Sequence, residues 1–264
     1  MNNLEIGVIV PTFNSAATLE WTLLALKNQD GCGVKIVVVD SGSTDETIEI
    51  CARHKVRTEY DPPGNMYRSI NVGMRLLDTE WVSYLNSDDI IYRDSYRRLT
   101  ELGDHTGADV VYGHSDYIDW QGRFISSLNA APPFLLCRLV DAGIMQFAQP
   151  AAIFRKAVYK DLKGFAEKYR SIADFDFFAR AILTGKKFER LSFPSVTAFR
   201  IHPNQFSHKE NGIAQEETSL FLKEWKTRNS LIRLLSFSAW RVLNAKHYLL
   251  RILRNGQLKS RPIE

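Results

Sequence analysis

The sequence has few cysteines and no pattern that would pair them or bind zinc. Its 264 residues include three cysteines, at positions 32, 51 and 137. A sparse, odd-numbered set argues against a disulfide framework and indicates a reducing compartment. No run of 18 apolar residues occurs, so we expect no membrane-spanning helix. Residues 1–5 lack the basic and then apolar pattern of a signal peptide.

Two common phosphate-binding signatures are also missing. No Gly-x-Gly-x-x-Gly follows the first apolar stretch, which argues against a dinucleotide cofactor, and no Walker loop occurs. The composition is otherwise that of an ordinary globular protein, with 45% hydrophobic and 24% charged residues. The length suits one large α/β domain, or one domain with an appendage.

Short apolar stretches alternate with helical patterns in the first third of the chain. Helices are expected over 16–28, with Ser15 as N-cap, over 45–54 and over 67–77. This rhythm predicts βαβ units and a Rossmann-like, mostly parallel sheet flanked by helices. The expected strands are Ile6–Val10, Val34–Val39, Val56–Tyr60 and Trp81–Leu85.

Polar segments follow three of these strands, and the carboxyl ends of parallel strands are where such sheets bind ligands. The segments are residues 12–14, 40–42 and 86–89. We therefore expect one shared site. Asp88 and Asp89 are adjacent and repel each other, which favours a cation such as Mg²⁺ or Mn²⁺ between them and substrate phosphates. A loop with two solvated aspartates is the simpler alternative.

The rhythm changes after Asp89. A hairpin turn is expected at Gln121-Gly122, and we predict a single domain over residues 1–205. Residues 1–90 would bind the nucleotide, and residues 91–205 would bind the acceptor and carry catalysis. The expected elements are strands over 109–112, 115–119, 124–127, 150–154 and 196–201, and helices over 134–141, 156–162 and 172–184.

The motifs at the strand ends resemble those of family 2 glycosyltransferases, which have the GT-A fold, of the bacterial cell-surface polysaccharide type. The resembling segments are Ile9–Asn14, Val39–Asp45 and Leu85–Asp89. Residues 173–176 resemble the family's segment that carries the catalytic base, and residues 199–202 resemble its Arg-x-His segment. The resemblance covers roughly residues 4–205.

The resemblance implies an inverting transfer of a sugar from a nucleotide-diphosphate sugar to a hydroxyl of a glycan or lipid-linked glycan, with Mn²⁺ or Mg²⁺ as cofactor and no nucleic acid partner. Asp174 would be the catalytic base, and Asp88 and His202 would hold the metal. One departure is Asn86, which stands where the family has the first aspartate of Asp-x-Asp. The nucleotide-binding residues implied are Pro11, Thr12, Phe13, Asn14, Asp40, Asn71, Asn86 and Ser87.

Other interpretations remain open at this point. Asn86 brings no charge, so a catalytically inactive protein that binds nucleotide sugars or acts as a scaffold is one alternative. A sugar-nucleotide pyrophosphorylase is another, although it would need a Gly-rich basic loop after the first strand. Asp40 could merely cap a turn, His202 could be a loop residue, and Asp176 competes with Asp174 as the base.

The end of the chain is strongly basic. From position 221 onward it has ten basic and two acidic residues, a net +8, which leaves −4 on the first 220 residues. Residues 206–264 are expected to form a helical extension. Residues 230–254 have apolar residues at helical spacing, only basic charges, and Trp240 and Tyr248, which predicts a helix lying on an anionic bilayer. We expect a cytoplasmic protein, peripheral on the inner face of the membrane. The alternatives are packing on the domain or on a second subunit.

Overall fold

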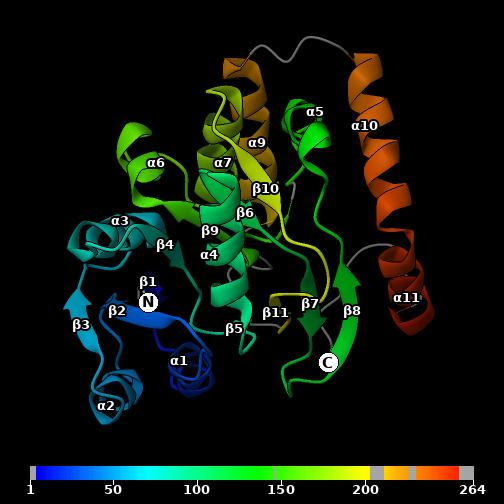
Figure 1. The fold of residues 1–264 in the computed structure, drawn as a ribbon. Coiled ribbons are helices and arrows are strands. Elements are labelled where there is room, and N and C mark those ends of the chain that lie inside the picture. The colour runs from blue at the N-terminus through cyan, green and yellow to red at the C-terminus, as the bar shows by residue number, and fades with distance from the viewer. Residues whose placement is uncertain (1–3, 146, 203–210, 226–229, 256–264) are drawn as a thin grey trace.

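The computed structural model describes residues 4–145, 147–202, 211–225 and 230–255. A seven-stranded sheet runs through the molecule in the order β10-β6-β9-β4-β1-β2-β3 (Figure 1). All neighbouring pairs are parallel except those of β9, which is antiparallel to β4 and β6. The mostly parallel sheet is thus confirmed. Its strands are β1 (Glu5–Thr12), β2 (Gly33–Asp40), β3 (Arg57–Tyr60), β4 (Trp81–Tyr84), β6 (Val110–Tyr112), β9 (Ala152–Arg155) and β10 (Phe188–Arg190).

Helices cover both faces of this sheet, so its central strands are buried on both sides and read as continuous apolar runs. Along β1 the side chains alternate: Ile9 joins one core, while Val8 and Val10 join the other. The core of Val8 contains residues of α1 (Leu19–Lys27), α2 (Thr47–Arg53) and α4 (Ser95–Thr106). The core of Ile9 contains residues of α3 (Met66–Leu76), α5 (Leu136–Asp141), α6 (Lys156–Asp161) and α7 (Ala173–Leu183).

A smaller sheet lies beside the large one, in the order β5-β11-β7-β8 (Figure 1). The β7–β8 pair is the predicted hairpin, and Gly122 in its turn has φ +82°, a conformation that favours glycine. β5 follows Asp89 directly and pairs with β11, so the end of β11 lies near that aspartate. The strands are β5 (Ile90–Ile91), β7 (Ser115–Ile118), β8 (Phe124–Leu128) and β11 (Thr197–Arg200).

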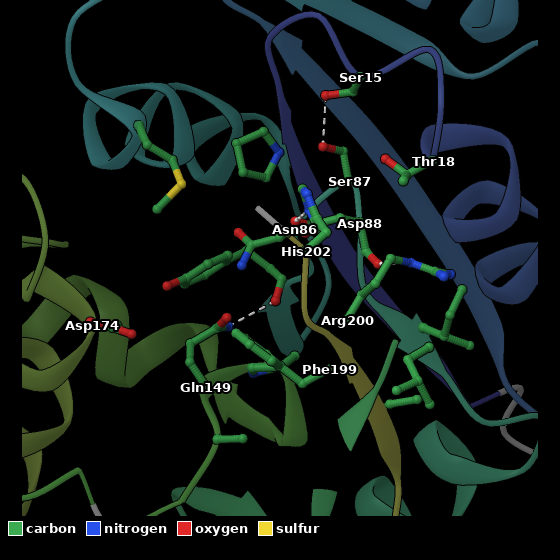
Figure 2. A pocket seen from close by; sticks show the side chains of 18 of the residues that line it. Ser15, Thr18, Asn86, Ser87, Asp88, Gln149, Asp174, Phe199, Arg200 and His202 are labelled. Atoms are coloured by element: carbon green, nitrogen blue, oxygen red, sulfur yellow. Dashed lines mark hydrogen bonds and ion pairs between the residues drawn. The ribbon is translucent and has the colours of Figure 1, made fainter. Parts of the chain in front are cut away.

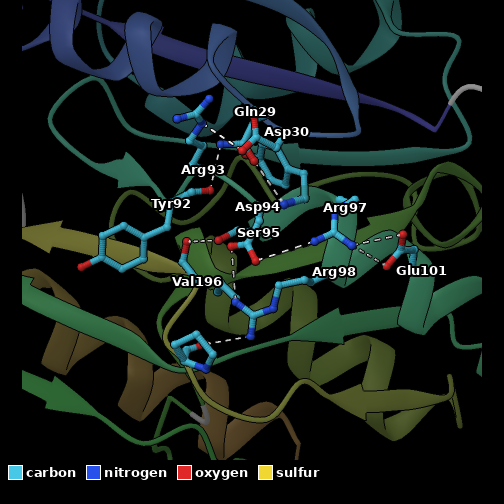
Figure 3. A network of polar contacts seen from close by, with 12 residues as sticks. Gln29, Asp30, Tyr92, Arg93, Asp94, Ser95, Arg97, Arg98, Glu101 and Val196 are labelled. Carbon is cyan, nitrogen blue, oxygen red and sulfur yellow. Dashed lines mark hydrogen bonds and ion pairs between the residues drawn. The ribbon is translucent and has the colours of Figure 1, made fainter.

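A polar network fixes the start of α4, a helix that the sequence patterns did not reveal (Figure 3). The Gln29 side chain donates to the carbonyl of Tyr92 at 2.9 Å and accepts from the amide of Tyr96 at 3.2 Å. Ser95 Oγ donates to the carbonyl of Val196 at 2.8 Å, just before β11. The network therefore ties the end of α1, the start of α4 and the start of β11 together.

Three C-terminal helices pack on this body: α9 (Asn211–Glu224), α10 (Ser230–Leu243) and α11 (Ala245–Asn255). Phe221 and Trp240 are buried in the same core as α7. The Glu217 carboxylate accepts hydrogen bonds from the backbone N–H groups of residues 170, 171 and 172, at 2.7, 3.0 and 3.2 Å. The predicted boundary at residue 205 falls in 203–210, outside the described residues. Of the helices described, none is long and apolar enough to cross a bilayer.

Several local predictions need correction. The strand expected over 150–154 begins as a 3-10 turn, η2 (Gln149–Ala151), because Pro150 cannot donate to a ladder. Another 3-10 turn, η1 (Pro133–Leu135), precedes α5. Ser15 does not cap α1, which begins four residues later; its hydroxyl lies 2.8 Å from that of Ser87 instead. The short strands β5 and β10 were not expected.

Candidate functional site

A cavity of about 2000 Å³ opens at the edge of the large sheet where β1 and β4 end. It exceeds the 300–1,000 Å³ typical of a single small-ligand pocket, so it has room for two substrates. Of the site residues predicted from the sequence, it gathers those of β1, of the loop after β4, of α7 and of β11. They are Pro11, Thr12, Phe13, Asn14, Asn86, Ser87, Asp88, Asp174 and His202.

Asp40 and Asn71, by contrast, do not line the cavity. Asp40 is buried, and each of its oxygens accepts two hydrogen bonds: Oδ1 from the hydroxyls of Thr12 and Ser43, and Oδ2 from the amides of Gly42 and Ser43, at 2.5–3.2 Å. A carboxylate has about four lone-pair positions, and all are used here. Asp40 thus holds Thr12, which does line the cavity, and the turn at Gly42 and Ser43, while its role in nucleotide binding stays a prediction.

Asn71 is likewise bonded within the chain, and it lies on the buried side of α3. Its Oδ1 accepts from the amide of Phe165 and the hydroxyl of Tyr159, both at 3.0 Å. Its Nδ2 donates to the carbonyl of Phe165 and to Glu167, both at 2.9 Å. These bonds join α3 to the loop before α7, and the nucleotide contact of Asn71 stays a prediction.

The loop after β4 is anchored by a buried carboxylate. Asp89 is fully buried, and its Oδ1 accepts from the backbone amide of Arg200 at 3.0 Å, while Thr22 Oγ1 donates to its carbonyl at 2.9 Å. Burial and the neighbouring Asp88 raise the pKa of Asp89 well above its usual range. Asp89 thus fixes the loop to β11 from beneath, while Asn86, Ser87 and Asp88 face the cavity.

Asp88 and His202 meet on one side of the cavity. His202 Nε2 and Asp88 Oδ2 are 2.9 Å apart, and Arg200 Nε donates to the carbonyl of Asp88 at 3.0 Å. The described residues contain no group of three or more His, Cys, Asp or Glu that could hold a metal. An oxygen and an imidazole donor at this separation nevertheless suit a divalent cation that fills its other positions with substrate oxygens and water.

Asp174 lies in the first turn of α7, apart from that pair, as Figure 2 shows. Its Oδ1 accepts from the hydroxyl of Tyr67 at 3.1 Å and from the amide of Phe175 at 2.8 Å. Burial raises the pKa of Asp174 to about 6. A carboxyl group with that pKa is a stronger base than a solvated aspartate and is still ionised at neutral pH.

The rival carboxylate, Asp176, points elsewhere. It is buried and forms an ion pair with Arg180, with Nε 2.8 Å from Oδ2. Arg180 also donates to the carbonyls of Leu162 and Gly164, at 2.6 and 2.9 Å. Asp176 does not line the cavity, and its contacts give it a structural role in holding the loop before α7.

Several lining residues were not identified as site residues from the sequence: Ser15, Gln149, Arg200, Trp240 and Tyr248. Arg200 lies in the Arg-x-His segment, which was a usable signal. Gln149 precedes a proline at an apparent strand start, and nothing in that pattern indicates a site. Trp240 and Tyr248 belong to α10 and α11, whose contact with the cavity depends on tertiary packing.

Comparison with known proteins agrees with this geometry. The model of the family described as "Glycosyl transferase family 2" matches residues 7–163, more than half of the chain. The chain belongs to this family. The matched region contains most of β1, the loop after β4 and η2, and it ends before α7 and β11. The glycosyltransferase class predicted from the strand-end motifs is thereby confirmed.

Relatives of this family 2 glycosyltransferase are found among bacterial enzymes. A "PGL/p-HBAD biosynthesis glycosyltransferase" of Mycobacterium tuberculosis is 28% identical over 229 residues, which is 82% of either chain. The "Poly(ribitol-phosphate) beta-N-acetylglucosaminyltransferase TarS" of Staphylococcus aureus is 27% identical over 201 residues, or 72% of this chain and 34% of TarS.

Two solved structures share the GT-A fold of this glycosyltransferase. Residues 1–349 of S. aureus TarS in complex with UDP-GlcNAc align with a TM-score of 0.65 and 20% identity, over 98% of this chain and 76% of that one. The mannosyltransferase PcManGT of Pyrobaculum calidifontis, in complex with GDP-Man and Mn²⁺, aligns with a TM-score of 0.59 and 17% identity, over 94% and 80%. At these identities the likeness supports the fold alone.

Proposed function

We propose that this glycosyltransferase moves a sugar from a nucleoside-diphosphate sugar to an acceptor hydroxyl, with inversion at the anomeric carbon, during glycan assembly. The observation that carries the proposal is one cavity with the Asp88–His202 pair on one side and Asp174 on another. A one-step inversion needs a base on the face opposite the leaving group. The Asp88–His202 pair would lie on the side of the leaving group, and Asp174 on the side of the base.

The nucleotide would lie along the ends of β1 and β4, against Pro11, Thr12, Phe13 and Asn14. Asn14 has φ +49° and is held there by two bonds: its Oδ1 accepts from the amide of Thr44 at 2.9 Å, and its own amide donates to Ser43 Oγ at 2.8 Å. Asn86 and Ser87 would contact the ribose and the diphosphate. Uracil is the first base to test, because a TarS structure contains UDP-GlcNAc.

Asp88 Oδ2 and His202 Nε2 would hold the divalent cation, and an imidazole ligand favours Mn²⁺ over Mg²⁺. Mn²⁺ is also present in the PcManGT complex. When bound, such a cation neutralises charge on the departing diphosphate. The guanidinium of Arg200, buried beneath Asp88, donates to carbonyls of Asp88 and Trp120, at 3.0 and 2.9 Å, and so keeps the Asp88 loop in place.

Asp174 would accept the proton of the acceptor hydroxyl as that oxygen bonds to the anomeric carbon. The bond from the anomeric carbon to the diphosphate oxygen breaks in the same step, and the nucleoside diphosphate leaves with the electron pair. Tyr67, whose hydroxyl donates to Asp174, keeps the other lone pairs of the carboxylate turned toward the cavity.

The acceptor side of the cavity is lined by apolar and aromatic residues of the loop after α5 and of the C-terminal helices, among them Ile144, Met145, Trp240 and Tyr248. We propose a glycan or lipid-linked glycan as acceptor. The relatives' names point the same way, since one belongs to PGL/p-HBAD biosynthesis and another acts on poly(ribitol-phosphate).

We further propose that α10 and α11 contact an anionic membrane surface. Outside the cavity these helices expose large apolar side chains, and the sequence has no acidic residue from 225 to 263. Arg241 and Lys246 are exposed on the same helices. Basic charge beside apolar side chains complements an anionic bilayer. The exposed apolar residues are Leu234, Leu235, Phe237, Val242, Leu249, Ile252 and Leu253.

The test of the enzyme proposal is metal-dependent donor chemistry. UDP-, GDP-, dTDP- and CMP-sugars are incubated with the protein, and nucleotide release is measured with Mn²⁺, with Mg²⁺ and with EDTA. We expect release with one donor class, loss in EDTA and recovery with Mn²⁺. Asp88→Ala should lose metal-dependent release while remaining folded, and the exposed Asp78→Ala is the matched control.

Two outcomes would reject parts of this proposal. Full activity in EDTA would remove the metal assignment. Donor binding by thermal shift, without release or transfer under any condition, would favour the alternative of a catalytically inactive nucleotide-sugar-binding protein, which the missing charge at Asn86 suggests.

A further inference from the structure

Gln149 reaches the cavity because of the one antiparallel strand in the large sheet. It is the first residue of η2, which leads directly into β9. Since β9 runs antiparallel to β4, its beginning lies at the edge where β4 ends and the Asn86–Asp88 loop starts. Gln149 lines the cavity although only 6% of its surface is exposed.

The orientation of its amide group is fixed by the backbone of β4. Nε2 donates to the carbonyl of Tyr84, the last residue of that strand, at 2.8 Å. A carbonyl can only accept, so the amide cannot be turned around without losing this bond. Oε1 is then the free end of the group. It is buried, and no described residue donates a hydrogen bond to it.

A buried acceptor without a partner is uncommon and indicates that something outside the chain supplies a donor. The atom is uncharged and accepts only, so a phosphate oxygen, itself an acceptor, is a poor partner for it. A hydroxyl or an N–H group suits it. In Figure 2 Gln149 lies between Asp174 and the loop of Asn86 and Asp88.

In the proposed function, on which this inference rests, this position corresponds to that of the transferred sugar. The transferred sugar is joined to the diphosphate and is attacked from the side of the base, so it must lie between the two. We propose that Gln149 Oε1 accepts a hydrogen bond from a hydroxyl, or an acetamido N–H, of the transferred sugar. Gln149 then contributes to the choice of donor sugar.

A site built to hydrogen-bond one substrate hydroxyl discriminates strongly against a substrate without it, because its own buried polar group is then left unpaired. The experiment therefore crosses protein variants with donor analogues. Gln149→Met keeps the length of the side chain but removes Oε1. Gln149→Asn keeps the amide but withdraws it by one methylene, and it serves if the Met variant does not fold.

Wild type and variants are assayed with the best nucleotide sugar of the panel, with its epimers and with deoxy analogues at each hydroxyl. We expect one deoxy analogue to lose at least tenfold in kcat/KM with wild type. With the variant, kcat/KM for the parent donor should fall by the same factor. Removing that hydroxyl from the donor should then cause no further loss. Affinity for the free nucleoside diphosphate, measured by thermal shift, should stay within twofold.

Three outcomes decide the matter. Equal donor discrimination in wild type and variant overturns the role of Gln149 while leaving the proposed function intact. A variant that also loses affinity for the free nucleoside diphosphate contradicts a sugar contact, because Gln149 would then shape the nucleotide subsite. No binding of any nucleotide or nucleotide sugar by wild type rejects the proposed function itself, and this inference with it.

Discussion

The two sides of the cavity differ in how they are built. The strand-end side, residues 11–14 and 86–88, is polar, and buried carboxylates support it from beneath: Asp40 accepts four hydrogen bonds, and Asp89 accepts the backbone amide of Arg200. The helix side, formed by α7, α10, α11 and the residues from the loop after α5 to η2, is largely apolar, and Asp174 is the carboxylate among its described lining residues. The strand-end side thus suits a group of fixed structure, such as a nucleoside diphosphate. The helix side suits a sugar acceptor that varies, and it holds the proposed base, Asp174.

The two sides also differ in where their buried carboxyl groups lie. On the strand-end side, Asp89 is fully buried, and burial and the neighbouring Asp88 raise its pKa well above its usual range. On the helix side, burial raises the pKa of Asp174 to about 6, while its Oδ1 accepts from Tyr67 and Phe175. Asp89 does not line the cavity and Asp174 does, so of these two only Asp174 is placed for the proposed proton transfer.

The largest effect is expected from removing the proton acceptor. Asp174→Asn keeps the shape of the side chain and can still accept from Tyr67, but it cannot take a proton. Turnover should fall by roughly 10²–10⁴-fold, the usual contribution of general-base catalysis. Donor affinity, measured by thermal shift, should remain, because Asp174 lies apart from the residues assigned to the diphosphate.

Asp176→Asn is the matched control, two positions further along the same helix. It breaks the charge pairing with Arg180 and should lower the melting temperature while changing turnover little. The opposite pattern, with turnover lost in Asp176→Asn and retained in Asp174→Asn, would move the catalytic role to the other carboxylate.

A second prediction concerns pH. Because the base must be ionised, kcat/KM should fall about tenfold for each pH unit below about 6. The contribution of Asp174 to the free energy of unfolding should change in the opposite sense and decrease as pH rises. The folded-state pKa lies above the ordinary value, so folding favours the protonated form, and that contribution is lost as pH rises through about 6.

The Asn variant should therefore be more stable than wild type at pH 8, by up to about 3 kcal/mol, and equal to it near pH 4. Thermal melts of both proteins across this range measure the gain. A constant difference in melting temperature at all pH values would show that ionisation of Asp174 carries no cost in the folded state.

The outer surface of the helix side offers a weaker effect. Leu249 and Leu253 on α11 are 55% and 72% exposed, so Leu249→Glu with Leu253→Glu should leave folding unchanged. The double variant should lose most of its co-sedimentation with anionic vesicles at low salt. Ile48→Glu, at a 42% exposed position on α2, should bind as wild type does. Wild type that stays in the supernatant would refute the membrane proposal.

The smallest expected effect belongs to Asn86→Asp on the strand-end side. The change adds a carboxylate near Asp88 and Asp89, and Asn86 Nδ2 already lies 3.4 Å from Asp89 Oδ2. Like charges repel, so the variant should melt at a lower temperature in EDTA. Mn²⁺ should recover more stability in the variant than in wild type. An identical Mn²⁺ response in both proteins would place the cation away from Asn86.

The strand-end side could be predicted from the sequence because its signals are local. An apolar run that stops at a polar segment marks both a strand and the edge where it ends, and the parallel sheet then brings these edges together. The roles of individual side chains were harder to predict. Whether Asp40 faces a ligand or its own backbone depends on the tight turn at Gly42, where φ is +84°.

The helix side was mostly hidden from sequence reasoning. Gln149 reaches the cavity only because β9 is antiparallel, and Trp240 and Tyr248 reach it only because α10 and α11 fold back onto the body. These contacts join positions far apart in the chain, and no local periodicity encodes them. Asp174 was identified through its resemblance to a family segment and not through its pattern.

Because Glu217 accepts hydrogen bonds from the backbone just before α7, the order in which the chain is translated bears on when the site is complete. Residues 170–172 lead into the turn that presents Asp174, and the carboxylate that fixes them belongs to α9, about fifty residues later. A ribosome-bound chain that ends before α9 contains every strand of both sheets, but not the Glu217 carboxylate that holds the segment before Asp174, the proposed proton acceptor. Catalytic competence is therefore expected to arise late in translation, after the nucleotide-binding portion has formed.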